Sequence, residues 1–482
     1  MAWSYTAQAL NFFIAFGSSL VVARLVTLRE FGIFAMAGAI TSILAILFSV
    51  GLATYIVREE QIDTPKLRSV FTVNVLLTSL LATAFFSAGL AATHVFDSPD
   101  VGQFLRLYSI VPLISMFEFV PQALLSRDMR FKAVSLLSLL RTASLYGTII
   151  LLAANGFGHM SFAWGMVASA AASTIVCQFL LWKPSVWLPR LEGFRAILKF
   201  GLQMISITGF SQFSTRASEM VLGSGLGLAT LGLYARASSL SSQLYQNIYG
   251  GATAVVFAKL SADLREKGNF HDVYLRALRL LLAVTWPMLG GLAVLSAPAI
   301  YHLYGAQWLG ASLPLTLLLI AYAIALGFAM EREVFVLRGE TSRQVKIEAA
   351  RATVGFALFS AGTLIGLAAA AAARIVETLL AYLLYRPHMD RLVGTTRGEL
   401  DRIYWEGLLL SLAAVLPSFA LMLWYGWSPR TPLPLVAGAV LLGVFGWAGL
   451  VFLRRHVLLE ELQRALRPLR RRSSVESLGG TN

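Results

Sequence analysis

The chain has 482 residues, of which 57% are hydrophobic and only 13% are charged, and its formal net charge is +14. Ordinary soluble domains carry about 25% charged residues, so a water-soluble fold of this composition would expose far too much apolar surface. The apolar residues occur in long blocks. Because backbone N–H and C=O groups must be paired internally in lipid, such blocks are expected to be membrane-spanning helices of roughly 20 residues. The single cysteine, Cys177, excludes an internal disulfide and a thiol metal cluster.

Apolar stretches predict fourteen membrane helices in an all-α polytopic protein. Residues 1–20 lack a basic n-region and a cleavage site, so they are expected to form the first helix rather than a removed signal. The eleventh and twelfth stretches are flanked by basic residues at both outer ends, which predicts a hairpin that turns near Gly366. The predicted spans are 4–26, 33–57, 69–93, 103–125, 133–154, 160–182, 197–222, 231–257, 277–297, 309–331, 348–365, 367–385, 404–425 and 433–453.

The basic residues predict the orientation. All but eight of the 39 lysines and arginines lie in seven segments that would face the cytoplasm if both termini are cytoplasmic, as the positive-inside rule requires. The exceptions are Arg24, Arg29, Arg106, Arg141, Arg216, Arg236, Arg374 and Arg430. The basic charge is therefore explained by topology and by contact with anionic lipid headgroups, without a nucleic-acid partner. Residues 454–472 are predicted to form a basic amphipathic helix at the membrane surface, or alternatively a charged topogenic end.

The first predicted helix pair overlays the seventh and eighth helices without a gap when the sequence is shifted by 200 residues. Nine positions are identical: Phe13/Phe213, Ser18/Ser218, Val21/Val221, Leu28/Leu228, Gly32/Gly232, Ala35/Ala235, Ala37/Ala237, Ser42/Ser242 and Leu44/Leu244. Six helices separate the copies, so both enter the membrane in the same direction. Parallel repeats of this kind are typical of alternating-access transporters with a site between the halves. The predicted organisation is an N-lobe at 1–190, a C-lobe at 191–392, helices 13 and 14 at 393–453, and a basic cytoplasmic tail at 454–482.

Polar residues recur at helical spacing on the repeat-related helices. The first helix carries Gln8, Asn11, Ala15 and Ser18, the seventh carries Thr208, Ser211, Thr215 and Ser218 beside Gln212, Arg216 and Glu219, and the eighth carries Arg236, Ser239, Gln243, Gln246, Gly250 and Thr253. Polar faces on helices this apolar are expected to face a water-filled cavity. The alternative for each stripe is close packing of helices through small residues.

Charged residues inside the predicted spans need a reason, because each costs roughly 2.5–3.5 kcal/mol near the bilayer centre on insertion scales. They are Glu118, Arg141, Arg216, Glu219, Arg374 and Glu377, with Arg24 and Arg236 nearer the outer ends. The i,i+3 pairs either neutralise each other or form a cationic cavity for an anionic group, with carboxylates that carry protons. The sequence contains no P-loop, paired metal-ligand motif or nucleophile elbow, and its six histidines are scattered, so an enzyme, a metal and a cofactor are not expected.

Four motifs carry a resemblance to a known family. They are residues 23–35 (ARLVTLREFGIFA), 51–60 (GLATYIVREE), 121–131 (PQALLSRDMRF) and 227–237 (GLATLGLYARA). In order and spacing they resemble the polysaccharide-transport branch of the multidrug/oligosaccharidyl-lipid/polysaccharide exporter superfamily, especially its colanic-acid-type exporters. The resemblance covers nearly the whole chain. One departure is that Arg216 and Glu219 occur together where relatives often carry a lone acidic or amide residue.

The resemblance implies two six-helix lobes in a V shape that flip an undecaprenyl-diphosphate-linked oligosaccharide across the bacterial inner membrane, coupled to an ion and independent of ATP. A surface-polysaccharide polymerase and export machinery are the implied partners. The rival functions are a drug/cation antiporter of the same superfamily and a polytopic glycan polymerase or ligase.

Arginine suits a diphosphate because its planar fork donates two hydrogen bonds and stays charged. Two sets of site residues follow. The expected diphosphate and sugar ligands are Arg216, Arg236, Arg24, Arg374, Gln8, Asn11, Thr208, Gln212, Gln243 and Gln246, and the expected ion-coupling carboxylates are Glu219, Glu377 and Glu118.

Overall fold

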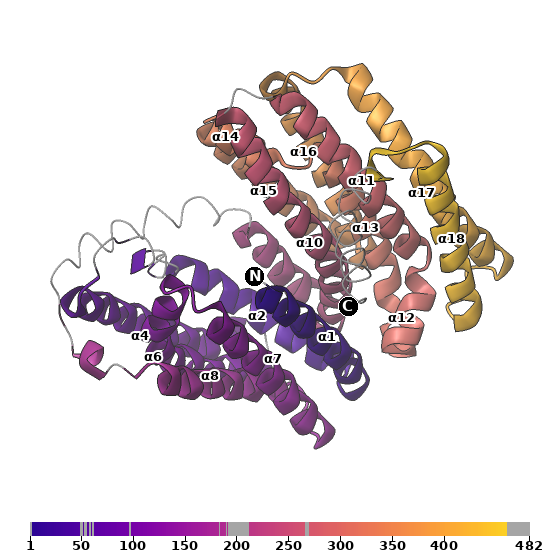
Figure 1. The fold of residues 1–482 in the computed structure, drawn as a ribbon. Coiled ribbons are helices and arrows are strands. Elements are labelled where there is room, and N and C mark those ends of the chain that lie inside the picture. The colour runs from indigo at the N-terminus through magenta and orange to yellow at the C-terminus, as the bar shows by residue number, and fades with distance from the viewer. Residues whose placement is uncertain are drawn as a thin grey trace, which may run out of the picture. The chain divides into compact units, whose positions relative to one another are not determined.

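The computed structural model describes residues 2–48, 52, 55–56, 59, 62–95, 98–182, 184–188, 190, 212–265 and 269–459, and these residues form helices with no strand among them (Figure 1). The chain divides into two compact units. Unit 1 comprises Met1–Ala235 with Thr363–Leu367, and unit 2 comprises Arg236–Gly362 with Ala368–Asn482. The predicted tail beyond residue 459 and the predicted site residue Thr208 lie outside the described residues.

The helices of unit 1 overlap the predicted spans, and residues 197–211 of the predicted seventh span lie outside the described residues. These helices are α1 (Ala2–Leu25), α2 (Leu28–Phe48), α4 (Thr64–Val95), α5 (Pro99–Tyr108), α6 (Ile110–Arg127), α7 (Phe131–Ala154), α8 (Met160–Leu180), the short η1 (Pro184–Trp187) and a helix at 212–226. Helix α7 packs against α1 and α8, and α4 packs against α5 and α6. The predicted fourth span is formed by α5 and α6 together, which are separated at Ser109.

Unit 2 contains the remaining helices, and α10 (Leu228–Arg265) begins in unit 1 and continues into it. They are α11 (Phe270–Val294), α12 (Ser296–Tyr304), η2 (Ala306–Ala311), α13 (Ser312–Ala325), η3 (Leu326–Phe328), α14 (Glu331–Leu337), α15 (Thr341–Ile365), α16 (Leu367–Val393), α17 (Arg397–Trp424) and α18 (Leu433–Leu453). Helix α17 packs against both α11 and α18. The predicted hairpin is confirmed, because Gly366 separates α15 from α16 with a φ of 148° that only glycine adopts readily.

Eleven of the described helical segments are long and apolar enough to cross a membrane. Two of the other three predicted spans correspond to α10 and α15, which carry more polar or charged residues. The third, 197–222, is described only from residue 212, so the helix at 212–226 is too short to be counted. The all-α polytopic membrane fold is therefore confirmed, and the total of fourteen crossings stays a prediction.

The sequence repeat reappears in the helix boundaries. Helix α2 begins at Leu28 and α10 begins at Leu228, which is the same shift of 200 residues. In the first copy the Thr27 and Glu30 side chains cap the start of α2, with Thr27 N–H 2.7 Å from a Glu30 carboxylate oxygen. In the second copy Gly227, with a φ of 86°, occupies the position of Thr27. The two helices therefore begin at equivalent positions of the repeat, although different residues precede them.

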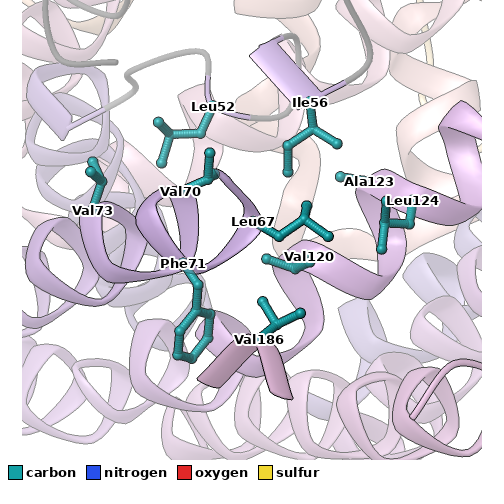
Figure 2. Packing of buried hydrophobic residues seen from close by; sticks show 10 residues of the cluster. All are labelled: Leu52, Ile56, Leu67, Val70, Phe71, Val73, Val120, Ala123, Leu124 and Val186. Atoms are coloured by element: carbon teal, nitrogen blue, oxygen red, sulfur yellow. The ribbon is translucent and has the colours of Figure 1, made fainter. Parts of the chain in front are cut away.

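An apolar cluster lies where α4 begins and α6 ends (Figure 2). Leu67, Val70 and Phe71 from α4 meet Val120 and other residues from α6. The buried members are Leu52, Ile56, Leu67, Val70, Phe71, Val73, Val120, Ala123, Leu124 and Val186. This close packing holds α4, α6 and η1 together, because helices in a membrane associate through van der Waals contacts between their side chains.

Candidate functional site

The described candidate residues are divided between the two units. Unit 1 holds Gln8, Asn11, Arg24, Glu118, Gln212, Arg216 and Glu219, and unit 2 holds Arg236, Gln243, Gln246, Arg374 and Glu377.

Glu118 lies in a junction of three helices in unit 1. Its side chain on α6 is 1% exposed, and its Oε1 lies 2.7 Å from Arg141 Nη2 on α7. Ser173 on α8 donates a hydrogen bond of 2.7 Å to the other carboxylate oxygen and accepts one of 3.2 Å from Arg141 Nε. Arg141 also donates to the Gln122 side chain at 3.3 Å. The buried carboxylate is therefore ion-paired and hydrogen-bonded rather than isolated.

Arg216 and Glu219 form an i,i+3 ion pair on the helix at 212–226. Arg216 Nη1 lies 2.9 Å from Glu219 Oε2, and the Glu219 side chain is 8% exposed while that of Arg216 is 36% exposed. Arg216 Nε is buried without a hydrogen-bond partner among the described residues. The arginine thus keeps donor capacity beyond the pair, which an anionic ligand requires.

The polar face of α1 is only partly engaged in helix packing. Asn11 Nδ2 donates a hydrogen bond of 2.9 Å to Ser138 Oγ on α7, which supports the helix-packing interpretation for this residue. Gln8 and Arg24 are exposed on the same helix, and Gln212 is exposed at the start of the helix at 212–226.

Arg236 is held between aromatic rings in unit 2. Its guanidinium carbon lies 4.7 Å from the ring centres of both Tyr304 and Trp308, and the residue is 4% exposed. Such contacts stabilise a desolvated guanidinium by about 2 kcal/mol. The aromatic partners follow Arg236 by about 70 residues, so its helical stripe gave no indication of them.

The second i,i+3 pair joins α16 to α15. Arg374 Nη1 lies 2.6 Å from Glu377 Oε2, both side chains are nearly buried, and the guanidinium carbon lies 4.5 Å from the Phe359 ring centre. The Glu377 carboxylate lies against Gly355, where a Cβ would come within 2.5 Å of it. Glycine at this position is what admits the carboxylate between the two helices.

Helix α10 presents two different faces within unit 2. Gln243 and Gln246 are exposed, whereas the adjacent Leu244 lines an apolar groove. The groove volume is about 470 Å³, and its walls come from α10, α11, α17 and α18. They are Leu244, Val284, Pro287, Met288, Gly291, Leu292, Leu295, Ala414, Ser418, Val440, Val444 and Trp447. Sequence reasoning missed this groove, because it requires four helices distant in the chain.

The predicted span 309–331 is broken before its end. Met330 adopts a left-handed conformation with a φ of 65°, between η3 and α14. Side chains satisfy the interrupted backbone: Tyr404 donates to the Gly327 carbonyl at 2.6 Å, and the Met330 N–H donates to the Tyr249 hydroxyl at 2.8 Å. Arg386 donates to the same Gly327 carbonyl at 3.3 Å. Unpaired backbone in a membrane costs several kcal/mol per group, so these side chains make the break possible.

Comparisons with known proteins agree with this architecture. The chain is 25% identical to the succinoglycan biosynthesis transport protein ExoT of Rhizobium meliloti (strain 1021) over 313 residues, which are 64% of this chain and 62% of ExoT. It is 21% identical to the lipopolysaccharide biosynthesis protein WzxC of Escherichia coli (strain K12) over 315 residues, 64% of this chain and 63% of WzxC. The matches thus span less than two thirds of the length of either relative.

Solved structures share the fold. The lipid II flippase MurJ in an inward closed conformation superposes with a TM-score of 0.74 at 16% identity, covering 95% of this chain and all of MurJ. An inward-facing multidrug resistance transporter of the MATE family superposes with a TM-score of 0.60 at 17% identity, covering 82% of this chain and 99% of that one. The polysaccharide biosynthesis protein family matches residues 21–313, and this chain belongs to that family.

Proposed function

We propose that this protein is a flippase that moves undecaprenyl-diphosphate-linked oligosaccharide repeat units across the bacterial inner membrane for surface polysaccharide biosynthesis. The observation that carries the proposal is the apolar groove between α10, α11, α17 and α18, which adjoins the polar face of α10. On α10, Leu244 lines the apolar groove, whereas the exposed Gln243 does not. This arrangement suits a ligand with an apolar chain and a hydrophilic head. Lipid-linked sugars have that construction.

The charges favour an anionic headgroup. In the described spans Glu118, Glu219 and Glu377 each lie within 3 Å of an arginine nitrogen, so none is an isolated carboxylate offered to a cation. Arg216 retains an unbonded Nε among the described residues and suits a diphosphate. The rival function of a drug/cation antiporter requires an acidic cavity, and these pairs argue against one.

Transport proceeds by ion-coupled alternating access in this proposal. The lobes at 1–190 and 191–392 rock against each other, while Arg216, Arg236, Arg24 and Arg374 attract the diphosphate and the polar stripes contact the sugars. Glu219 and Glu377 are the proposed proton carriers. The protein makes and breaks no covalent bond, both termini are cytoplasmic, and a polysaccharide polymerase and the export machinery act on the product.

The groove provides a test with a matched control. Gly291 lines it, and no atom lies within 4 Å of where its Cβ would stand, so the side chain of Gly291→Leu can start into the groove without displacing the backbone. Gly449 on α18 has equally open surroundings and does not line the groove, so Gly449→Leu is the control. Both variants would be placed in a deletion strain, and lipid-bound repeat units would be measured in each leaflet.

We expect the deletion strain and Gly291→Leu to accumulate repeat units on the cytoplasmic leaflet, and Gly449→Leu to restore export. Normal export by Gly291→Leu, with membrane insertion verified, would remove the groove from the mechanism. A deletion strain with no accumulated lipid-bound repeat units would contradict the flippase function itself.

A further inference from the structure

A second, chemically different cavity lies at the end of the same helices in unit 2. Its volume is about 360 Å³, and it is lined by Arg279 from α11, by Arg402 and Glu406 from α17, and by residues 454–457 after the end of α18. Leu410 and Leu450 form part of its apolar wall. Because α17 begins and α18 ends here, the cavity lies at the level of the membrane where a span meets water.

The cavity has more cations than its carboxylate can neutralise. Glu406 lies between two arginines, with Arg279 Nε 3.3 Å from Oε2 and Arg402 Nε 3.3 Å from Oε1. Arg454 and Arg455 also line the cavity, both are exposed, and neither forms an ion pair with another described residue. Four arginines against one glutamate leave a local excess of positive charge.

His456 supplies a buried donor with no acceptor among the described residues. The residue is 8% exposed, and its Nδ1 accepts a hydrogen bond of 3.2 Å from the Leu458 N–H. Burial lowers the pKa of His456, so the ring is neutral near pH 7 and carries its proton on Nε2. Among the described residues Nε2 has no hydrogen-bond partner, although it is buried. A buried donor in this state requires an acceptor.

The backbone after α18 is held in an unusual conformation that brings these residues to the cavity. Arg455 adopts a φ of 46°, at the position after a helix end where glycine is usual. The His456 N–H donates to the Val451 carbonyl at 3.0 Å, and the Arg455 N–H donates to the Phe452 carbonyl at 3.1 Å, which closes the turn. A non-glycine residue in the left-handed region destabilises the fold by about 1 kcal/mol, and such residues cluster at ligand sites.

We propose that this cavity binds the phosphate group of an anionic membrane phospholipid, with the arginines and His456 Nε2 as donors and Leu410 and Leu450 against the first part of an acyl chain. Guanidinium groups bind phosphate oxygens in a bidentate manner, and basic cavities between membrane helices suit lipid headgroups. A soluble anion would make no use of the apolar wall. The site is separate from the proposed transport residues, and it does not depend on the proposed function.

The test measures the thermal unfolding of the full purified chain in detergent, with added phosphatidylglycerol or phosphatidylcholine. Arg454→Gln removes one guanidinium, and Arg455→Gly removes another while relaxing the left-handed backbone, so that folding is preserved. Arg397→Gln is the matched control, since Arg397 is an exposed arginine at the start of α17 that does not line the cavity.

We expect phosphatidylglycerol, and not phosphatidylcholine, to raise the melting temperature of the original protein and of Arg397→Gln. Arg454→Gln and Arg455→Gly should each weaken phosphatidylglycerol binding about tenfold, the loss typical of one charged hydrogen bond. Equal responses in all four proteins would overturn the site. Equal stabilisation by inorganic phosphate, or stabilisation by undecaprenyl diphosphate alone, would overturn the assignment to a phospholipid.

Discussion

Arg141 and Glu118 form an ion pair of 2.7 Å in which the glutamate side chain is almost wholly buried and the arginine side chain is 41% exposed. The partners come from α7 and α6, and Ser173 from α8 bonds to both. This asymmetry of burial means that the two halves of the pair contribute differently to stability.

Removing the arginine should therefore destabilise the protein more than removing the carboxylate. We expect Arg141→Gln to lower the free energy of unfolding by roughly 3 kcal/mol, the low end for a broken buried pair, because it leaves a buried charge. Glu118→Gln should cost about 1 kcal/mol, because the amide still accepts from Ser173 and Arg141 keeps its hydrogen bonds to Ser173 and Gln122. Thermal unfolding of the purified variants measures both, and an equal loss in the two would refute the asymmetry.

Gly32 should tolerate no side chain. A Cβ there would overlap the Leu228 carbonyl oxygen, and a backbone carbonyl cannot turn away as a side chain can. We expect Gly32→Ala to lower stability by about 1–3 kcal/mol. Gly38→Ala is the control on the same helix, since nothing lies within 4 Å of its Cβ position, and it should be neutral or stabilising by up to about 1 kcal/mol. A comparable loss in both would show that helix propensity, and not this contact, decides the result.

Variants of Arg216 can show whether its pair with Glu219 only neutralises charge or provides a cation for an anionic ligand. We expect Arg216→Ala to abolish export while the protein remains inserted, and the exchanged variant Arg216→Glu/Glu219→Arg to be equally inactive, because a phosphate site needs the cation at its own position. Export would be measured as surface polysaccharide in a deletion strain. Normal export by the exchanged variant would mean that the pair only neutralises its own charge.

The proposed proton carriers predict a pH effect. Glu219→Gln and Glu377→Gln should each remove the pH dependence of transport in proteoliposomes, because an amide cannot exchange a proton over the range in which the original carboxyl titrates. Glu406→Gln is the control, since Glu406 lies outside the proposed transport site. An unchanged pH profile in both carboxylate variants would contradict this role.

The break before α14 depends on the side chains that bind its backbone. Arg386 is 5% exposed and binds Asp390 at 2.6 Å as well as the Gly327 carbonyl, so Arg386→Met should cost roughly 2 kcal/mol through the loss of these charged hydrogen bonds. Tyr404→Phe removes one hydrogen bond of 2.6 Å to that carbonyl and should cost about 1 kcal/mol. Thermal unfolding provides the measurement, with the exposed change Arg397→Lys expected to lie within about 0.5 kcal/mol of the original.

Helices and their connections follow from sequence because their causes are local. Apolar length predicted the spans, flanking charge predicted the turn at Gly366, and the shift of 200 residues predicted that α2 and α10 correspond to each other. The i,i+3 contacts of Arg216 and Arg374 are likewise properties of one helix turn.

Contacts between residues far apart in the chain could not be predicted, because they depend on how the helices pack. Arg141 was recognised as a charge within a span, but its partner Glu118 lies on another helix. The aromatic enclosure of Arg236 joins α10 to residues near α12 and η2. The break at Met330 occurs in a stretch whose composition is as apolar as that of an unbroken helix, and it is held by side chains from three other helices.

The position of Gly32 against Gly232 has a consequence for how a duplicated chain diverges. Most positions in two copies of a repeat have different neighbours, so each copy can drift without regard to the other. These two glycines are neighbours: a Cβ on Gly232 would lie 3.2 Å from the Gly32 nitrogen and would overlap the Leu28 carbonyl oxygen. A larger residue at either position would clash with the backbone of the other copy. Both positions are therefore restricted to glycine by the same contact.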